Sequence, residues 1–347
     1  MKRLILCCDG TWNTADQDND GTPAPTNVVK LAYRIAKRDA AGVPQVIFYD
    51  QGVGTGNHVD RLTGGAFGQG LEDNIHDAYR FLIANYEPGD EIYLFGFSRG
   101  AFTARSIAGM IRKCGILNRA SVAQYVPAKQ LYHSAVRPDE APAAAFRAEH
   151  SCCGAEAIKV RCIGVWDTVG ALGIPLAGLR GLTRRDDDFH DTELSGTVEF
   201  GYHALAIDEH RGPFVPTLWM EKPKPNQVVE QTWFPGVHSD IGGGYPQSAL
   251  SDIALEWMIE RARGTGLAMD EEFLRRFPLH PDPLGTKHDS RSFMYKFTRP
   301  VERAIDTSGT QRVHESVLQR WDHDPSYRPK NVRDWLGRQA DPRAGRP

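Results

Sequence analysis

The feature that most constrains this sequence is the motif Gly96-Phe-Ser98-Arg-Gly100, which joins an apolar segment directly to a helical pattern. Residues 92–95 are apolar and include β-branched and aromatic side chains, as expected for a buried strand. From Ala104 onward, apolar residues recur at helical spacing. A G-x-S-x-G motif between a strand and a helix is typical of a nucleophile elbow, a strained turn that exposes a serine hydroxyl. Ser98 is therefore a candidate nucleophile, and the alternative is an inert serine in a glycine turn.

The segments around this motif alternate between strand-like and helix-like patterns. Continuous apolar runs predict buried strands at residues 4–8, 46–49, 92–95, 159–165 and 228–234, and residues 200–207 fit either a helix or a strand. Amphipathic spacing predicts helices within residues 28–35, 75–86, 104–111 and 253–259. Such alternation predicts a mainly parallel sheet with helices on both faces. Together with the elbow, this predicts an α/β fold of the α/β-hydrolase-like type.

We expect residues 1–347 to form a single α/β-hydrolase domain, with loop and helical insertions at about residues 115–158 and 171–200. The first of these segments is rich in alanine with scattered proline, which favours helices outside the core sheet. From about residue 265 the pattern becomes less regular, and only a helix around residues 317–321 is predicted there.

Composition excludes several classes of protein. The chain has 41 basic and 44 acidic residues and no concentrated basic segment, so a nucleic-acid partner is not expected. Its six cysteines form no C-x-x-C pair, which favours reduced thiols in a cytosol-like compartment. The apolar run at residues 4–8 is too short for a signal peptide, and no stretch is long enough to span a membrane. We therefore expect a protein that is cytoplasmic as synthesised, so that any export would be non-classical.

Two further residues follow predicted strands in the order that a serine hydrolase requires. A serine hydroxyl needs a base to take its proton, and the base needs an acid to hold its tautomer. In α/β-hydrolases the chain order is serine, acid and histidine, and Ser98, Asp167 and His238 occur in that order. Because the carboxyl ends of parallel strands share one edge of the sheet, we predict that these three side chains meet as nucleophile, acid and base.

Other residues could fill the same roles. His203 and His210 are alternative bases, and Asp208 and Asp240 are alternative acids. His210 lies in a run of charged residues, which more often indicates a structural network of ion pairs. His238 is flanked by glycines, which let a loop backbone approach other elements closely. This context favours His238 as the base.

An oxyanion hole is also required. One donor should be the backbone N–H of Arg99, directly after the nucleophile, and the second should come from Gly10 or Thr11, after the first strand. Asp9 precedes these residues, and its carboxylate would oppose a developing oxyanion. We therefore expect the Asp9 side chain to turn away and bond a loop backbone.

No cofactor and no metal are expected. The aspartate-rich loop that starts at Asp16 resembles a calcium loop, but its twelfth position is Asn27 rather than a glutamate. The glycine-rich loop around residues 52–56 lacks the Gly-Lys-Ser/Thr end of a phosphate-binding loop. The first is interpreted as a solvated loop and the second as a flexible loop beside a site.

Several long motifs resemble one known family. They are CCDGTWN (7–13), GFSRGAFTAR (96–105), VWDTVGALG (165–173), FHDTELS (189–195), YHALAIDEHRGPF (202–214) and WFPGVHSDIGGGY (233–245). Over about residues 1–330 the sequence resembles the catalytic domain of type VI secretion phospholipase effectors of the G-x-S-x-G class. The resemblance implies Ser98, Asp167 and His238 as the triad and a glycerophospholipid acyl ester at a membrane surface as substrate. It also implies secretion machinery or an immunity protein as partners, whereas the membrane-targeting regions of the larger effectors have no counterpart here.

These observations predict a serine hydrolase that cleaves carboxylic esters through an acyl-enzyme on Ser98, with phospholipase-like or lipase-like activity. The apolar segment 171–179, with Leu172, Ile174 and Leu176, is expected to contact an acyl chain or to act as a lid. Two alternatives stay open. The chain could be a soluble carboxylesterase for small esters, or a non-catalytic binding module on a hydrolase scaffold.

Overall fold

The computed structural model describes residues 1–10, 13–52, 64–170, 194–219, 223–291, 299–307 and 309–340. These residues form a seven-stranded sheet in which every pair of neighbouring strands is parallel. Its strands are β1 (Arg3–Cys8), β4 (Gln45–Asp50), β5 (Glu91–Phe97), β6 (Val160–Trp166), β7 (Val198–Ala206), β8 (Val228–Phe234) and β9 (Gln311–Val313). A separate two-stranded ribbon contains β2 (Asp18–Asn19) and β3 (Thr22–Pro23).

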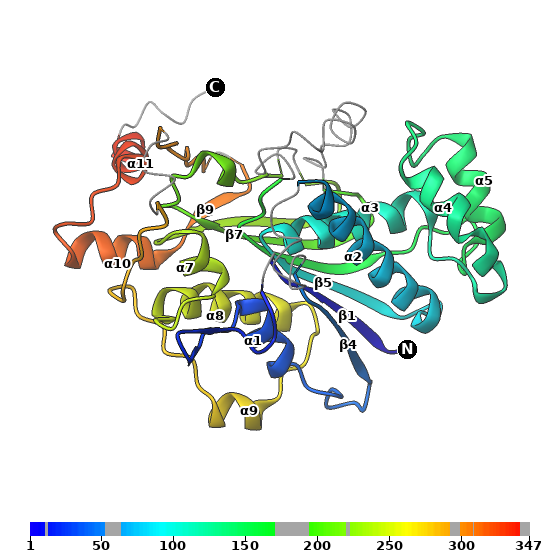
Figure 1. Cartoon of the computed structure of the whole chain (residues 1–347), viewed down its shortest axis with the longest axis horizontal. Coiled ribbons are helices and arrows are strands. Elements are labelled where there is room, and N and C mark those ends of the chain that lie inside the picture. Colours follow the sequence, from blue (N-terminus) through cyan, green and yellow to red (C-terminus); the bar gives the residue numbers. More distant parts are fainter. Residues whose placement is uncertain are drawn as a thin grey trace.

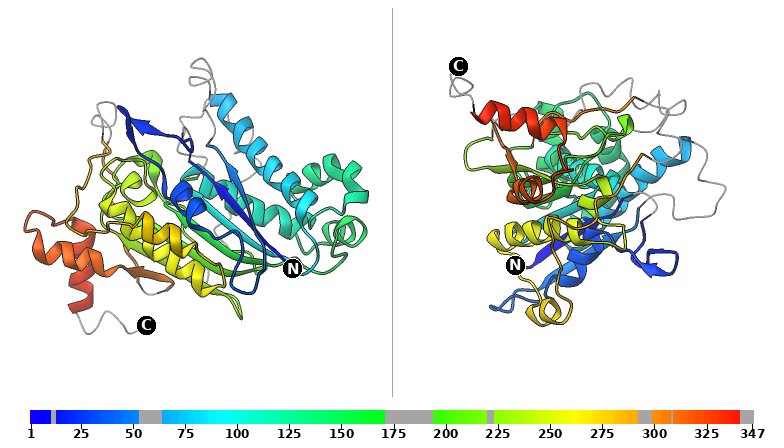
Figure 2. Two further views of the ribbon diagram at one scale, coloured as in Figure 1. Left: turned by 90° about the horizontal axis from the view of Figure 1, so that it is seen from below. Right: turned by 90° about the vertical axis from the view of Figure 1, so that its left-hand side faces the viewer.

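Helices lie on both faces of the sheet (Figures 1 and 2). The longer ones are α1 (Asn27–Arg34), α2 (Gly64–Asn85), α3 (Arg99–Cys114), α4 (Tyr125–Tyr132), α5 (Ala141–His150), α8 (Ala249–Gly264), α10 (Glu315–His323) and α11 (Lys330–Ala340). Shorter helical segments are η2 (Arg119–Gln124), η4 (Gly212–Phe214), α7 (His238–Gly242) and α9 (Glu271–Arg276). The predicted fold class, a mainly parallel sheet with helices on both faces, is confirmed.

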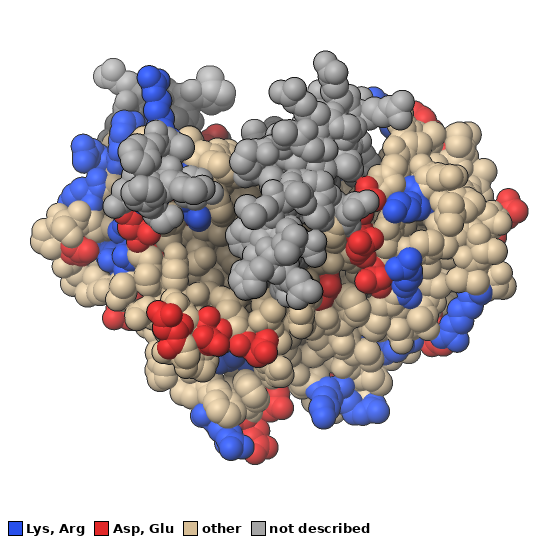
Figure 3. Space-filling view, in the orientation of Figure 1, with Lys and Arg blue, Asp and Glu red and all other residues tan. Residues whose placement is uncertain are grey.

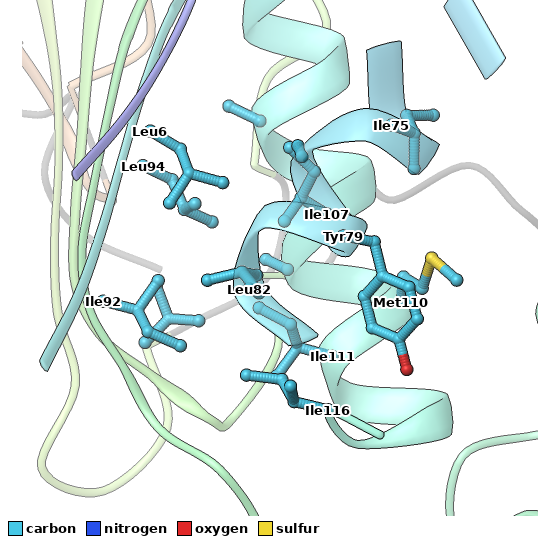
Figure 4. Close-up of a cluster of buried hydrophobic side chains, with 14 of the residues drawn as sticks. Leu6, Ile75, Tyr79, Leu82, Ile92, Leu94, Ile107, Met110, Ile111 and Ile116 are labelled. Carbon is cyan, nitrogen blue, oxygen red and sulfur yellow. The ribbon is translucent and has the colours of Figure 1, made fainter. Parts of the chain in front are cut away.

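Alternation along β1 explains why the sheet needs two helical layers. Leu4 and Leu6 belong to a buried cluster with α2 and α3, and Figure 4 shows Leu6 facing those helices. Ile5 and Cys7 belong to a second cluster with α1 and α8. Successive side chains of a strand point to opposite faces, so a strand that is apolar at every position is buried on both sides.

The order of the strands defines where a ligand would bind. The sheet runs β4-β1-β5-β6-β7-β8-β9, so the chain leaves β1 for β4 on one side and returns to β5 on the other. The strand order therefore reverses between β1 and β5. In open parallel sheets this switch point opens a crevice at the carboxyl ends of the strands. The loops that begin at Asp9 and Ser98 both start at that crevice.

The segments whose structure was least clear from the sequence form regular elements. Residues 200–207 lie mostly in strand β7, and residues 118–158 contribute η2, α4 and α5, at the right in Figure 1. The C-terminal part holds more regular structure than predicted, because β9 joins the sheet and α10 and α11 pack beside it. A third buried cluster forms there from Leu205, Ile207, Trp233, Ile305, Val317 and Val332. That the whole chain is a single domain stays a prediction.

Candidate active site

Ser98 occupies a strained turn between β5 and α3. Its φ of 58° and ψ of −120° lie in a region that residues other than glycine rarely adopt. Its N–H donates to the carbonyl oxygen of Trp166 at 3.0 Å, which ties the turn to the end of β6. Glycine is needed at position 100, because a Cβ atom there would collide with the carbonyl oxygens of Cys8 and Asp9. The elbow is thus packed directly against the end of β1.

Three predicted residues form one hydrogen-bonded chain. His238 Nε2 lies 2.8 Å from Ser98 Oγ, and His238 Nδ1 lies 2.6 Å from Asp167 Oδ2. All three side chains are buried. In the neutral imidazole that this chain requires, the Ser98 hydroxyl donates to Nε2 and the Nδ1–H donates to the carboxylate. The elements that place them are the ends of β5 and β6 and the start of α7.

Asp167 is also held by a cation that the sequence did not indicate. Arg303 donates from Nη1 to Asp167 Oδ1 at 2.7 Å and from Nη2 to Oδ2 at 3.1 Å. The backbone N–H of Ala206 donates to the same Oδ1 at 3.0 Å. Burial would raise the pKa of Asp167, but the charge of Arg303 and the hydrogen bond from His238 hold it well below its usual range. Asp167 is therefore held as a carboxylate at neutral pH.

Arg303 is itself buried and fixed from several sides. It donates to the carbonyl oxygens of Ala206, at 2.7 Å, and of Phe214. Asn331 of α11 donates to the Arg303 carbonyl oxygen at 3.1 Å. No periodic pattern or motif surrounds Arg303 in the sequence, so only the fold of the C-terminal part reveals this contact.

The surroundings of His238 favour its neutral form. Its ring lies between those of Phe97 and Phe214, with centroid distances of 4.6 and 4.9 Å. Burial lowers the pKa of His238 below its ordinary value, although Asp167 acts in the opposite direction. A neutral imidazole can accept the proton of Ser98, whereas a charged one cannot.

The competing histidines and acids have other partners. His203 Nε2 accepts from the Thr168 N–H at 3.1 Å, and His210 Nδ1 lies 3.1 Å from the carbonyl oxygen of Val301. Asp208 accepts from the Gly236 N–H and from the hydroxyl of Tyr327. Asp240 accepts from the Val237 N–H and from His288. Among the described residues, His238 is the one of the three histidines that contacts Ser98.

The structure describes two of the three residues that were predicted as oxyanion donors, Gly10 and Arg99. Arg99 is the first residue of α3, so its N–H follows the candidate nucleophile. The Gly10 N–H donates to Asp9 Oδ1 at 2.7 Å, and Thr11 lies outside the described residues. Asp9 also accepts from the hydroxyls of Thr26 and Tyr49, and burial raises its pKa to about 6. The Asp9 side chain thus bonds the backbone of its own loop at Gly10, as predicted, and also the start of α1 and the end of β4.

The predicted acyl-chain residues Leu172, Ile174 and Leu176 lie outside the described residues. On the face in Figure 3, acidic and basic side chains both occur over the described surface, and neither sign covers it. Among the described helices, none combines the length and the apolar character needed to cross a membrane.

The parallel sheet, the elbow at the switch point and the buried serine–histidine–aspartate chain define an α/β-hydrolase-like protein. Residues 2–261 match the family described as "T6SS, Phospholipase effector Tle1-like, catalytic domain". The chain belongs to this family. Membership supports a lipase-like or phospholipase-like hydrolase activity.

Three relatives of this chain are longer than it, and two of them are only 18% identical to it. An uncharacterized protein of Saccharomyces cerevisiae is 33% identical over 233 residues, which are 61% of this chain and 32% of that protein. A crystal structure of an uncharacterized protein from Pseudomonas aeruginosa is 18% identical, with a TM-score of 0.46, and the match covers 78% of this chain and 46% of that one. The Tle1 effector bound to the VgrG spike of the type 6 secretion system is also 18% identical, with a TM-score of 0.42 and coverages of 70% and 51%. The chain thus spans about half or less of each relative.

Proposed function

We propose that this chain is a serine hydrolase that cleaves carboxylic esters of lipids through an acyl-enzyme on Ser98. The observation that carries the proposal is the buried chain of hydrogen bonds from Ser98 through His238 to Asp167. A serine with this partner can lose its proton as it attacks, which an isolated serine cannot do at neutral pH.

In the proposed reaction, Ser98 Oγ attacks the ester carbonyl carbon while His238 Nε2 takes the hydroxyl proton. The tetrahedral intermediate then expels the alcohol, which receives that proton from His238, and the acyl group stays on Ser98. A water molecule, deprotonated by His238, attacks the acyl-enzyme; the bond to Ser98 Oγ then breaks, the fatty acid leaves, and His238 returns the proton to Ser98 Oγ. Asp167 keeps Nδ1 of His238 protonated throughout, so that Nε2 points its lone pair at Ser98.

The oxyanion hole in this proposal uses the Arg99 N–H and a donor from the loop after β1. Gly10 is the weaker candidate for the second donor, because its N–H already binds the Asp9 carboxylate. Thr11 stays the alternative from the sequence. Loss of one such donor typically lowers the rate by about 10²–10³-fold.

The family supports a phospholipid as the substrate, with the reaction at a membrane surface and with secretion machinery as a partner. Only the family supports the phospholipid, whereas the acyl-enzyme is supported by the contacts of Ser98, His238 and Asp167. The same site would also suit a carboxylesterase for small soluble esters. Assays with both kinds of substrate are therefore needed to distinguish a phospholipase from a carboxylesterase.

Covalent labelling tests the nucleophile. A fluorophosphonate is expected to label the folded chain at Ser98, as located by peptide mass spectrometry, and Ser98→Ala should remove the label. A folded protein that stays unlabelled at Ser98 would instead be a non-catalytic module. A panel from short-chain nitrophenyl esters to diacyl phospholipid vesicles then tests the substrate, with Ser98→Ala as the blank. Activity that rises on vesicles supports the phospholipase, and activity confined to short soluble esters supports the carboxylesterase.

A further inference from the structure

A cluster of metal-ligating side chains lies away from the candidate active site, between α2 and α4. Glu72 and His76 are four residues apart on α2, so they share one face of that helix. His133 follows the last residue of α4. One ligand atom from each of these three residues lies within 4.8 Å of the other two. The cluster therefore joins a core helix to the helical insertion, both of which lie on the right in Figure 1.

His76 is the unusual member of this cluster. The residue is only 4% exposed, yet neither Nδ1 nor Nε2 has a hydrogen-bond partner in the part of the chain that the structure describes. Its neighbours Ile75 and Tyr79 belong to the apolar core drawn in Figure 4, so the backbone fixes His76 in place. A buried imidazole that bonds nothing is costly, and nearly all buried polar groups are satisfied. A ligand at one ring nitrogen would remove part of this cost.

We propose that Glu72, His76 and His133 bind a divalent transition-metal ion, with zinc as the best fit. Two imidazoles and one carboxylate are a donor set that zinc uses, whereas calcium and magnesium prefer all-oxygen ligands. Three protein ligands leave a fourth position for water. The half-exposed His133 and Glu72 give the ion a path from solvent.

The geometry requires only a small closure. Ligand atoms around a tetrahedral zinc lie about 3.4 Å apart, given metal–ligand distances near 2.1 Å. Glu72 Oε1 already lies 3.9 Å from His133 Nε2, and both side chains are partly exposed, so they can move toward His76. Neither ring nitrogen of His76 bonds another group among the described residues, so a lone pair is available for the ion. A neutral imidazole with an available lone pair is the form that binds a metal.

The positive charge of Lys129 lies beside Glu72 and should repel a bound cation, so its removal tests the metal site. Its ammonium lies 3.3 Å from Glu72 Oε2, so the metal must displace or repel it. This ion pair is partly exposed and therefore contributes little. Removal of Lys129 should strengthen metal binding by about 2- to 5-fold, the reverse of what loss of a ligand would do.

The test uses the full chain, stripped with a chelator and titrated with Co²⁺, which reports its coordination by visible absorption, and then with Zn²⁺ in competition. We expect one bound ion per chain, with the absorption of a four-coordinate site and no sulfur-to-metal charge transfer. The last condition excludes the partly buried thiols of Cys152 and Cys153 as ligands. His133→Ala and Glu72→Gln change partly exposed side chains, so both variants should fold, and each should weaken binding by more than about 10-fold.

Lys129→Gln should bind more tightly than the unchanged chain. His323→Ala is the matched control, because His323 is exposed on α10 and, among the described residues, its ring bonds the carbonyl oxygen of Gln319 alone. This variant should bind cobalt as the unchanged chain does. Failure to bind Co²⁺ or Zn²⁺ at millimolar concentration would overturn the proposal. Binding that His133→Ala and Glu72→Gln leave unchanged would overturn it equally, since the ion would then lie elsewhere.

Discussion

Arg303 forms a bidentate ion pair with Asp167, with N–O distances of 2.7 and 3.1 Å, and both residues are buried. The carboxylate that orients His238 is therefore shared between two partners. Arg303 lies beyond the residues that match the family, so the C-terminal part of this chain contributes directly to the proposed active site. Because Arg303 contacts Asp167 and not Ser98, we predict that it acts as a positioning residue rather than a catalytic one.

Arg303→Gln is expected to impair both stability and turnover. Loss of one partner of a buried ion pair leaves the other charge uncompensated, at a cost of about 3–5 kcal/mol in the free energy of unfolding. The freed carboxylate should also hold His238 less well, and a misplacement of about 1 Å can lower kcat by about 10²-fold. Loss of the positive charge should raise the pKa of Asp167 and that of His238. The acid limb of the pH profile should therefore move to higher pH.

Arg320→Gln is the control for this prediction. Arg320, on α10, is also buried, but it donates to the carbonyl oxygens of Pro283 and Gly285 and not to a residue of the candidate active site. This variant should lose stability and leave the acid limb of kcat/KM in place. If both variants give the same pH profile as the unchanged chain, Arg303 has a structural role only.

The pH dependence of activity follows from His238. Burial lowers the pKa of His238 below its ordinary value of 6.5, and Asp167 only partly restores it. A general base must be neutral in the free enzyme. Activity should thus be full above the pKa of His238 and fall as the pH drops through it. We expect an acid limb of kcat/KM below pH 6.5, measured with an uncharged soluble ester. An acid limb above that value would contradict the assignment.

Substitution of two glycines of α3 by alanine should change the free energy of unfolding in opposite directions. A Cβ at Gly100 would meet the carbonyl oxygens of Cys8 and Asp9, which are backbone atoms and cannot turn aside. Gly100→Ala should therefore lower the free energy of unfolding by about 1–3 kcal/mol or more and abolish labelling of Ser98. A Cβ at Gly109 would meet only Tyr132, at 4.0 Å.

Gly109→Ala should accordingly stabilise α3 by about 0.5–1 kcal/mol, because glycine is entropically unfavourable inside a helix. Urea unfolding of both variants measures these changes. Equal effects of the two substitutions would mean that the close packing of the elbow against β1 is not what requires glycine.

Asp50, at the end of β4, should make stability depend on pH. Burial, with the charges of Asp77 and Asp9, raises the pKa of Asp50 to about 7, and Oδ2 finds no hydrogen-bond partner among the described residues. A carboxyl whose pKa is raised by folding stabilises the protein at low pH, and this contribution is lost as the pH rises through the folded pKa. The loss is at most about 1.4 kcal/mol per pH unit between the unfolded and folded values.

Asp50→Asn mimics the protonated carboxyl, so it should stabilise the protein by about 1–3 kcal/mol at about pH 8 and by less at about pH 5. Urea midpoints at the two pH values measure the difference. The control is Asp139→Asn, because Asp139 is exposed and forms a surface ion pair with Arg112. A stabilisation by Asp50→Asn that is the same at both pH values would show that burial does not perturb this carboxyl.

Much of the architecture could be predicted because strands and helices have local signatures. The apolar runs at residues 4–8 and 92–95 form β1 and β5. The alternation of patterns was enough to predict a parallel sheet, and the confirmed fold class follows from it. Strand β9 could not be found in this way, because three residues at the edge of a sheet carry no periodic signal.

The sequence by itself determined the strained serine between a strand and a helix, and the order in which Asp167 and His238 follow it. Each of these residues stands at the end of an element with a readable pattern, and all parallel strands end at one edge. Only the tertiary structure decided that Arg303 shares Asp167 and that His133 meets Glu72 and His76. These contacts depend on how side chains from distant segments are packed, and no local spacing records them.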